Sequence, residues 1–265
     1  MIKGLILFLS FLTALTAQAK YEIPDDKNVM HHFGECRAEF LPPQFHLFVW
    51  NIKKAEAKDN WARDFQHFVS NADIVLIQEA MMDGYMPSVA LRHKEFCWDF
   101  AASFIDNDRN PTGVMNGSPT VPLSLHFLRS PGREPVIKTP KMVIVGEYAL
   151  ANMKDTLLVA NIHGLNFVKD QQNREQIEQV ASFLKDHRGP IIFAGDFNTW
   201  NGNRLKYLDE ILGAIGLKKL PFEGDNRRFK LDHIYVRGLE ATQTDLYNDI
   251  ESSDHKPISA DFRIR

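Results

Sequence analysis

The sequence predicts a layered α/β fold in a single domain. Short apolar runs rich in β-branched and aromatic residues recur along the chain, segments with helical spacing separate them, and no linker-like stretch follows residue 40. The 265 residues, 44% hydrophobic and 25% charged, exclude a disordered, collagen-like or coiled-coil chain. The net charge of −3 disfavours binding of polyanions through bulk positive charge, although it allows a local basic groove.

The first nineteen residues have the features of a secretory signal peptide. Lys3 supplies a positive start, the apolar run 5–15 is too short to span a bilayer comfortably, and the AQA at 17–19 fits a small-x-small cleavage pattern. We therefore expect residues 1–19 to be removed and the protein to be exported, either to the periplasm or as a secreted protein. An uncleaved N-terminal anchor is the alternative.

Export changes the interpretation of the only two cysteines, Cys36 and Cys97. An oxidising compartment allows them to form a disulfide, and two cysteines are too few for a zinc site built on thiolates alone. Two buried free thiols are the alternative. A disulfide would hold residues 20–44, an N-terminal leader that we expect to pack on the domain formed by residues 45–265.

The first elements of the domain alternate between strand and helix. Residues 45–52 (FHLFVWNI) are rich in aromatic and β-branched side chains and predict a strand. Residues 60–70 have helical spacing, with Trp61 and Phe65 on one side. The apolar run at 73–79 (DIVLIQE) predicts the second strand.

The middle of the chain predicts more strands. Residues 96–104 and 123–128 are strand-like and flank a stretch rich in Asn, Gly and Pro, residues 106–122, which we expect to be a polar loop. Residues 142–150 and 156–162 are expected to pair as a hairpin.

The last third of the chain again alternates between predicted helices and strands. Residues 170–187 form the clearest amphipathic helix and residues 191–194 a buried strand. A second amphipathic helix is expected at 204–215, and the final strands at 231–236 and 258–264.

Six of these segments end in polar side chains. A single buried amide or imidazole at a strand end is most often structural and simply hydrogen-bonded. Six such ends in one chain indicate a site, because α/β sheets place functional groups at strand ends. The residues concerned are Asn51, Gln78, Glu79, Asn161, His163, Asn166, Asp196, Asn198, Asp232, His233, Asp254 and His255.

The chemistry of this set favours a hard divalent cation. The four carboxylates, with the amide oxygen of Asn51, suit Mg²⁺ or Mn²⁺, whereas no His-x-x-x-His pair suggests zinc. A dication together with imidazoles is suited to hydrolysis of a phosphate ester, since the metal neutralises phosphoryl charge and a histidine accepts a proton from water. Neither a G-x-S-x-G elbow nor a phosphate-binding G-x-x-x-x-G-K-[ST] loop is present.

These motifs and their order resemble the endonuclease/exonuclease/phosphatase superfamily of DNase I-like enzymes, and in particular an exported bacterial branch of it. The resemblance is carried by WNI at 50–52, QE at 78–79, NIHGLN at 161–166, GDFN at 195–198, LDHIYV at 231–236 and SDH at 253–255. It implies a four-layer α/β sandwich, with two packed mixed β-sheets and helices outside. It also implies a metal site in which Glu79 is the principal ligand, Asn51 lies beside it, and Asp254 lies near the metal or a second metal.

The resemblance implies the catalytic roles as well. His255 resembles the general base that activates water, and Asp232 the carboxylate that orients and stabilises its imidazolium. Asp196 would position the nucleophile or transfer a proton. Asn198 would donate to a phosphate oxygen, and His163 would stabilise the phosphoryl transition state.

Basic residues give a further indication of substrate binding. Arg174, in the helix after His163, is expected to order the site or reach phosphate, with a solvent-exposed helix charge as the alternative. Candidates to line a phosphate groove are Arg227, Arg228 and Lys230, just before Asp232, and the pair Lys138 and Lys141. A solvated surface is the alternative for these charges.

The sequence also departs from parts of the family. Repair endonucleases usually have Asn-x-Asp at the first strand, but Ile52 and Lys53 follow Asn51 here, and the Cys-Asp-Arg of inositol phosphatases is missing before the LDHI strand. We therefore expect a Mg²⁺- or Mn²⁺-dependent phosphodiesterase, foremost a nuclease, that acts as a monomer without an obligate protein partner. The alternatives are a lipid or inositol phosphate phosphoesterase and a catalytically inert binding module on the same fold.

Overall fold

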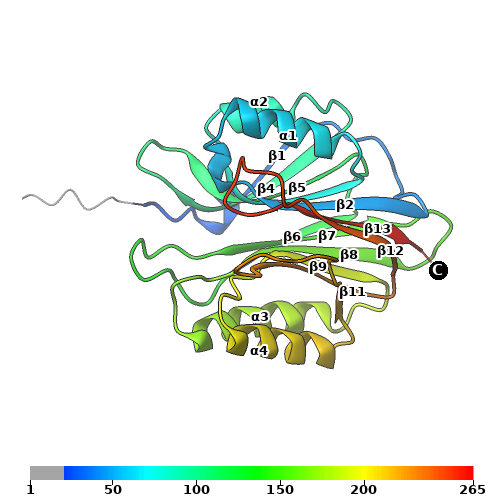
Figure 1. The fold of residues 1–265 in the computed structure, drawn as a ribbon. Coiled ribbons are helices and arrows are strands. Elements are labelled where there is room, and N and C mark those ends of the chain that lie inside the picture. Colours follow the sequence, from blue (N-terminus) through cyan, green and yellow to red (C-terminus); the bar gives the residue numbers. More distant parts are fainter. Residues whose placement is uncertain (1–20, 265) are drawn as a thin grey trace, which may run out of the picture.

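Two β-sheets pack face to face in a computed structural model that describes residues 21–264. Helices α1 (Asp59–Val69) and α2 (Tyr85–Ala90) cover the outer face of one sheet, and α3 (Asp170–Leu184) and α4 (Gly202–Ala214) cover the outer face of the other (Figure 1). The predicted four-layer α/β sandwich is therefore confirmed. The predicted signal peptide lies outside the described residues.

The first sheet has seven strands in the order β1-β4-β5-β3-β2-β13-β12. They are β1 (Met30–Gly34), β2 (Gln44–Asn51), β3 (Ile74–Met81), β4 (Cys97–Ile105), β5 (Pro111–Ser118), β12 (Glu240–Leu246) and β13 (Ile258–Arg263). Strands β2 and β3 are parallel, and the other pairs are antiparallel. Two 3₁₀ turns, η1 (Asp26–Asn28) and η2 (Lys53–Ala55), lie before β1 and after β2.

The second sheet has six strands in the order β10-β11-β9-β8-β7-β6. They are β6 (Ser124–Arg129), β7 (Met142–Ala149), β8 (Thr156–His163), β9 (Ile191–Asp196), β10 (Lys218–Lys219) and β11 (Asp232–Arg237). Strands β7 and β8 form the predicted hairpin, and β8 and β9 are the parallel pair. Both sheets are therefore mixed.

Side chains alternate along β2, so this strand contributes to two hydrophobic clusters on its opposite faces. Leu47 and Val49 pack in the core between the sheets, whereas Phe48 and Trp50 pack against α1 and α2. Both faces of the strand are buried, so its sequence reads as a continuous apolar run.

Strand β5 occupies a position where the sequence predicted a polar loop at 106–122, and that prediction was wrong. Its glycines are required by close neighbours rather than by a turn, since a Cβ at Gly117 would lie 2.2 Å from the ring of Trp98. Its polar side chains are buried, and Asn116 Oδ1 accepts a hydrogen bond from Asn161 of the other sheet. Strands β1, β10 and β12 and helix α2 were also missed.

The leader contributes an edge strand. Strand β1 pairs with β4, from Met30 opposite Ala101 to Gly34 opposite Cys97. A disulfide joins Cys36 to Cys97, with 4.8 Å between the Cα atoms. Within residues 21–264, no helix is long and apolar enough to cross a membrane.

Candidate active site

The ends of strands from both sheets meet at one end of the sandwich. Asn51 ends β2, and His163 and Asp196 face each other at the ends of the parallel pair β8 and β9. Asp232 starts β11 opposite Asp196. A hydrogen bond of 3.1 Å from Asn51 Nδ2 to Asp196 Oδ2 joins the two sheets, so these four strand-end residues form one cluster.

His255 and Asp232 form the central contact of this cluster. The Nδ1 atom of His255 lies 3.0 Å from each carboxylate oxygen of Asp232, and its Nε2 atom lies 4.0 Å from Asp196. The loop that carries His255 is fixed to β2, because Trp50 Nε1 donates to the His255 carbonyl and Ser253 Oγ donates to the Asn51 carbonyl.

The charges of this cluster are strongly coupled. Burial opposes protonation of His255, but the carboxylates of Asp232 and Asp196 outweigh it and raise the pKa of His255 to about 10. Burial raises the pKa of Asp196 to about 6, against the opposing charge of His255. A histidine with this pKa is protonated at neutral pH, so it can act as a base only when a cation offsets the neighbouring carboxylates.

A tight turn after β9 aims the side chains of Asp196 and Asn198. Gly195 has a φ of 135° and lies against the Ile162 carbonyl, where a Cβ would be 2.2 Å from the oxygen. Asn198 has a φ of 53°, its backbone N–H donates to Asp196 Oδ1 at 2.9 Å, and its Nδ2 lies 3.2 Å from Asp196 Oδ2. Asp196 is therefore held in one orientation by several donors.

His163 is held as a neutral imidazole. Its Nε2 accepts a hydrogen bond of 3.0 Å from the ammonium of Lys141 and lies 3.5 Å from Asp196. Burial, followed by the charge of Lys141, lowers the pKa of His163 well below its usual value. The Nδ1 atom therefore carries the ring proton.

Glu79 has the environment expected of a ligand for a hard cation. It has a φ of 52° in a bulge of β3, directly after the position that pairs with Asn51. Among the described residues its carboxylate has one close partner, His163 at 3.8 Å, and its side chain is 31% exposed. With the amide oxygen of Asn51 and the exposed carboxylate of Asp254, it offers the oxygen donors that Mg²⁺ or Mn²⁺ prefers.

A second group of donors lies nearby. Ligand atoms of Asp196, Asp232 and His255 all lie within 4.8 Å of one another. Because His255 Nδ1 already contacts both oxygens of Asp232, this trio is better arranged for proton transfer than for holding a cation.

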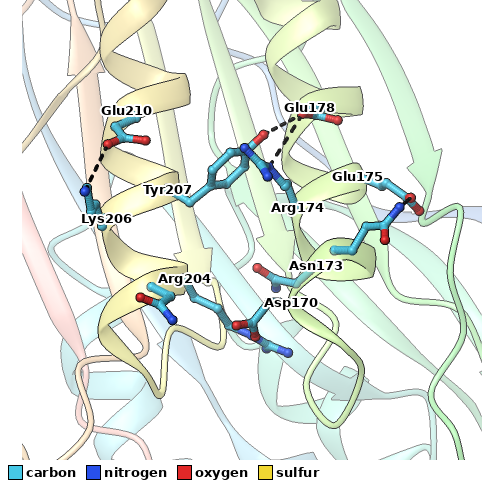
Figure 2. Close-up of a pocket in the computed structure, with 11 residues that line it drawn as sticks. Asp170, Asn173, Arg174, Glu175, Glu178, Arg204, Lys206, Tyr207 and Glu210 are labelled. Atoms are coloured by element: carbon cyan, nitrogen blue, oxygen red, sulfur yellow. Dashed lines mark hydrogen bonds and ion pairs between the residues drawn. The ribbon is translucent and has the colours of Figure 1, made fainter.

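The structure does not bring Arg174 to the site. Figure 2 shows its guanidinium in the groove between α3 and α4, stacked 3.6 Å from the ring centre of Tyr207 and 4.0 Å from Glu178. The phase of α3 turns the side chain outward, so the solvent-exposed alternative describes it.

Arg204 on α4 instead contacts the site loops, and the sequence analysis missed it. The buried guanidinium donates to the carbonyls of Leu165 and Asn198, both at 3.1 Å, and of Val168 at 2.6 Å. It also donates to the Asp170 carboxylate at 2.8 Å (Figure 2). It thereby fixes the loops that follow His163 and Asp196. A lone arginine in an amphipathic helix carries no motif that would reveal this.

Two neighbouring arginines before β11 also differ in whether they reach the site. Arg228 is exposed beside the ring of Phe229 and does not contact the catalytic cluster. Its neighbour Arg227 is buried, bonds to Asp225 at 3.0 Å, and lies 3.7 Å from Asp232 Oδ2.

Other polar strand ends are structural. Asn161 Nδ2 donates to Asn116 Oδ1 at 2.9 Å, and its Oδ1 accepts from Gln78 Nε2 at 2.7 Å, which ties the sheets together behind the site. His233 points away from Asp232 and lies 2.8 Å from Thr199 Oγ1.

Comparisons with known proteins agree with this fold. The profile of the endonuclease/exonuclease/phosphatase family matches residues 48–255. A relative named UPF0294 protein from Vibrio campbellii is 28% identical, over 98% of this chain and 96% of its own length. Among solved structures, an endonuclease/exonuclease/phosphatase from Beutenbergia cavernae superposes with a TM-score of 0.68 at 14% identity, over 83% of this chain and 72% of its own. ANGEL2, described as a 2′,3′-cyclic phosphatase in complex with adenosine-2′,3′-vanadate, superposes with a TM-score of 0.64 at 16% identity. The match covers 88% of this chain and 99% of the ANGEL2 chain.

Proposed function

The chain belongs to the endonuclease/exonuclease/phosphatase family, and from this premise we propose that it is an exported, divalent-metal-dependent phosphodiesterase that acts on nucleic acid. The contact of His255 with Asp232, beside Asp196, carries the proposal, because it supplies an oriented acid–base group. The disulfide supports a site of action outside the cytoplasm.

Each catalytic side chain has a role that its contacts support. His255 Nε2 accepts a proton from the attacking water, while Asp232 holds Nδ1 and stabilises the imidazolium. Asn198 would donate to a phosphate oxygen in place of its Nδ2 contact with Asp196. His163 would stabilise the phosphoryl transition state after its Nε2 takes a proton in place of the Lys141 contact, and Asp196 would orient the water. Mg²⁺ or Mn²⁺, held by Glu79, Asn51 and Asp254, would neutralise phosphoryl charge.

A substrate panel tests this proposal. Plasmid DNA, RNA, sphingomyelin, phosphoinositides and bis-p-nitrophenyl phosphate would each be assayed with Mg²⁺, with Mn²⁺ and with EDTA. We expect metal-dependent cleavage of nucleic acid and of the synthetic diester, and none with EDTA. Absence of activity on every substrate would favour an inert binding module.

One observation favours a lipid phosphodiester as the second candidate. Val136 is 87% exposed and Phe167 76% exposed, on loops that adjoin through the Phe167 N–H and Glu134. Phe229 is also exposed, on the loop before β11. Apolar side chains on loops around a site can insert into a bilayer surface. Cleavage of sphingomyelin in vesicles but not of nucleic acid would select this candidate.

A further inference from the structure

A small cavity opens beside the candidate metal ligand and is lined by two lysines. It has a volume of about 140 Å³, and its lining includes Glu79, His163, Lys54 and Lys141. Phe104 and Met142 contribute apolar wall. The side chains of two lysines therefore border the same small space, beside Glu79 and His163.

Lys141 is a largely buried cation with a single, long ion pair. Its side chain is 14% exposed, and its nearest carboxylate, Glu134, is 3.9 Å away. The oxygens of Glu134 are already engaged by the backbone N–H groups of Asn166, at 2.8 Å, and Phe167, at 3.4 Å. The ammonium donates to the neutral imidazole of His163. An ammonium at this depth, with one long ion pair and one neutral hydrogen-bond partner, would gain from an anion in the adjoining cavity.

Lys54 is presented by an unusual turn. Three successive residues after β2, Lys53, Lys54 and Ala55, have φ values of 46°, 56° and 56°, and none is a glycine. Such left-handed backbone is unfavourable and persists where the surrounding structure enforces it, which is common at functional sites. Lys53 pairs with Glu56 at 3.4 Å, but Lys54 has no ion pair with any carboxylate in residues 21–264.

We propose that Lys54 and Lys141 form a subsite for a second phosphoryl group of the substrate, next to the phosphodiester that is cleaved. This inference rests on the proposed function and narrows the substrate to phosphodiesters that carry a neighbouring phosphate, such as a phosphorylated strand end. Two ammonium groups match the charge of a phosphate monoester, and the limited volume accommodates one such group.

Phosphate binding to the metal-free protein tests the subsite without depending on catalysis. Inorganic phosphate would be titrated by calorimetry in EDTA into the wild type, Lys54→Asn and Lys141→Gln. Asparagine tolerates the left-handed backbone at position 54, so this variant removes the charge and keeps the turn. We expect each variant to bind roughly tenfold more weakly. Lys94→Asn, which removes an exposed ammonium outside the cavity lining, should bind as the wild type does.

Substrate discrimination provides the second test. The dinucleotides TpT, pTpT and TpTp differ only in a terminal phosphate, and kcat and KM would be measured for each with Mg²⁺. We expect the wild type to prefer one phosphorylated form through a lower KM, and each lysine variant to reduce that preference roughly tenfold. Equal loss on all three dinucleotides in Lys54→Asn, or unchanged phosphate binding in both variants, would overturn the subsite. Failure of the wild type to cleave any phosphodiester would instead refute the proposed function, and the calorimetric result would still decide the subsite.

Discussion

Asp232 and His255 lie 23 positions apart in the chain, yet both carboxylate oxygens of Asp232 lie 3.0 Å from His255 Nδ1. They meet because β11 begins in one sheet while the loop before β13 is fixed to β2 in the other. The contact leaves Nε2 directed toward Asp196, at 4.0 Å, which is the side where a water would be activated.

The first prediction is that His255 and Asp232 act as one unit. His255→Ala should lower kcat by roughly 10²–10⁴-fold, the usual contribution of a positioned acid–base group. Asp232→Asn should cost a similar factor, because the amide keeps the shape and loses the charge that raises the pKa of His255. The double variant should be little worse than the worse single variant in steady-state kinetics.

His233 is the internal control for this pair. It neighbours Asp232 in sequence but contacts Thr199 on the opposite face of β11, so His233→Ala should retain most of the activity. Losses that multiply in the double variant, or a His233→Ala loss as large as that of His255→Ala, would contradict the pairing.

The second prediction concerns the metal. Glu79→Gln should weaken activation by Mg²⁺ and lower activity while the circular dichroism spectrum is retained, since a neutral amide loses the charge that attracts a hard cation. Activity would be measured across a Mg²⁺ titration, with Glu95→Gln as a control that removes an exposed carboxylate outside the site. An ordinary Mg²⁺ titration in Glu79→Gln would exclude Glu79 as the principal ligand.

The third prediction separates the two arginines of Figure 2. Arg204→Met removes the donors that fix the carbonyls of Leu165, Val168 and Asn198, so kcat should fall roughly tenfold to a hundredfold with little change in KM. Arg174→Met removes an exposed stacking contact and should leave both parameters unchanged. Kinetics would be measured well below the unfolding temperature, because Arg204→Met should also lower stability. Equal effects of the two substitutions would show that Arg204 does not position the site.

The fourth prediction concerns stability in acid. Burial, followed by the charges of Lys219 and Arg227, lowers the pKa of His233 to about 4. Between pH 6.5 and 4 the unfolded chain binds a proton that the folded protein does not bind. The free energy of unfolding should therefore fall as the pH falls through this range, by about 3 kcal/mol from this group. His233→Gln should have a shallower pH dependence in urea unfolding, and an unchanged slope would contradict the assignment.

The fifth prediction is that the protein isolated under oxidising conditions contains the Cys36–Cys97 disulfide. Non-reducing peptide mapping should recover the linked peptides, and reduction should lower the free energy of unfolding by about 2–5 kcal/mol. The Cys36→Ser/Cys97→Ser variant should be insensitive to reductant. Alkylation of both thiols in the native, oxidised protein would refute the bridge.

The parts of this fold that could be predicted from sequence are those in which pattern and environment agree. The run ending at Asn51 is apolar because both faces of β2 are buried, and the polar residues after it can only lie at the edge of the sheet. Strand β5 could not be recognised, since its buried Asn and Gly residues are selected by contacts with β4 and β8 and have the composition of a turn. The sequence analysis named Arg174, but Arg204 is the arginine that contacts the site loops. Which of the two does so depends on how α3 and α4 are rotated relative to those loops, and the spacing of residues within one helix does not reveal that rotation.

The last two strands, β12 and β13, belong to the first sheet. In a chain that emerges amino-terminus first from a ribosome, they are therefore added to that sheet last. Glu79, His163 and Asp196 emerge before the segment that carries His255, and β13 must still add to β2. Until that segment arrives, Asp232 lacks its contact with His255. If the proposed function holds, a chain interrupted before β13 pairs with β2 would be folded in part but inactive.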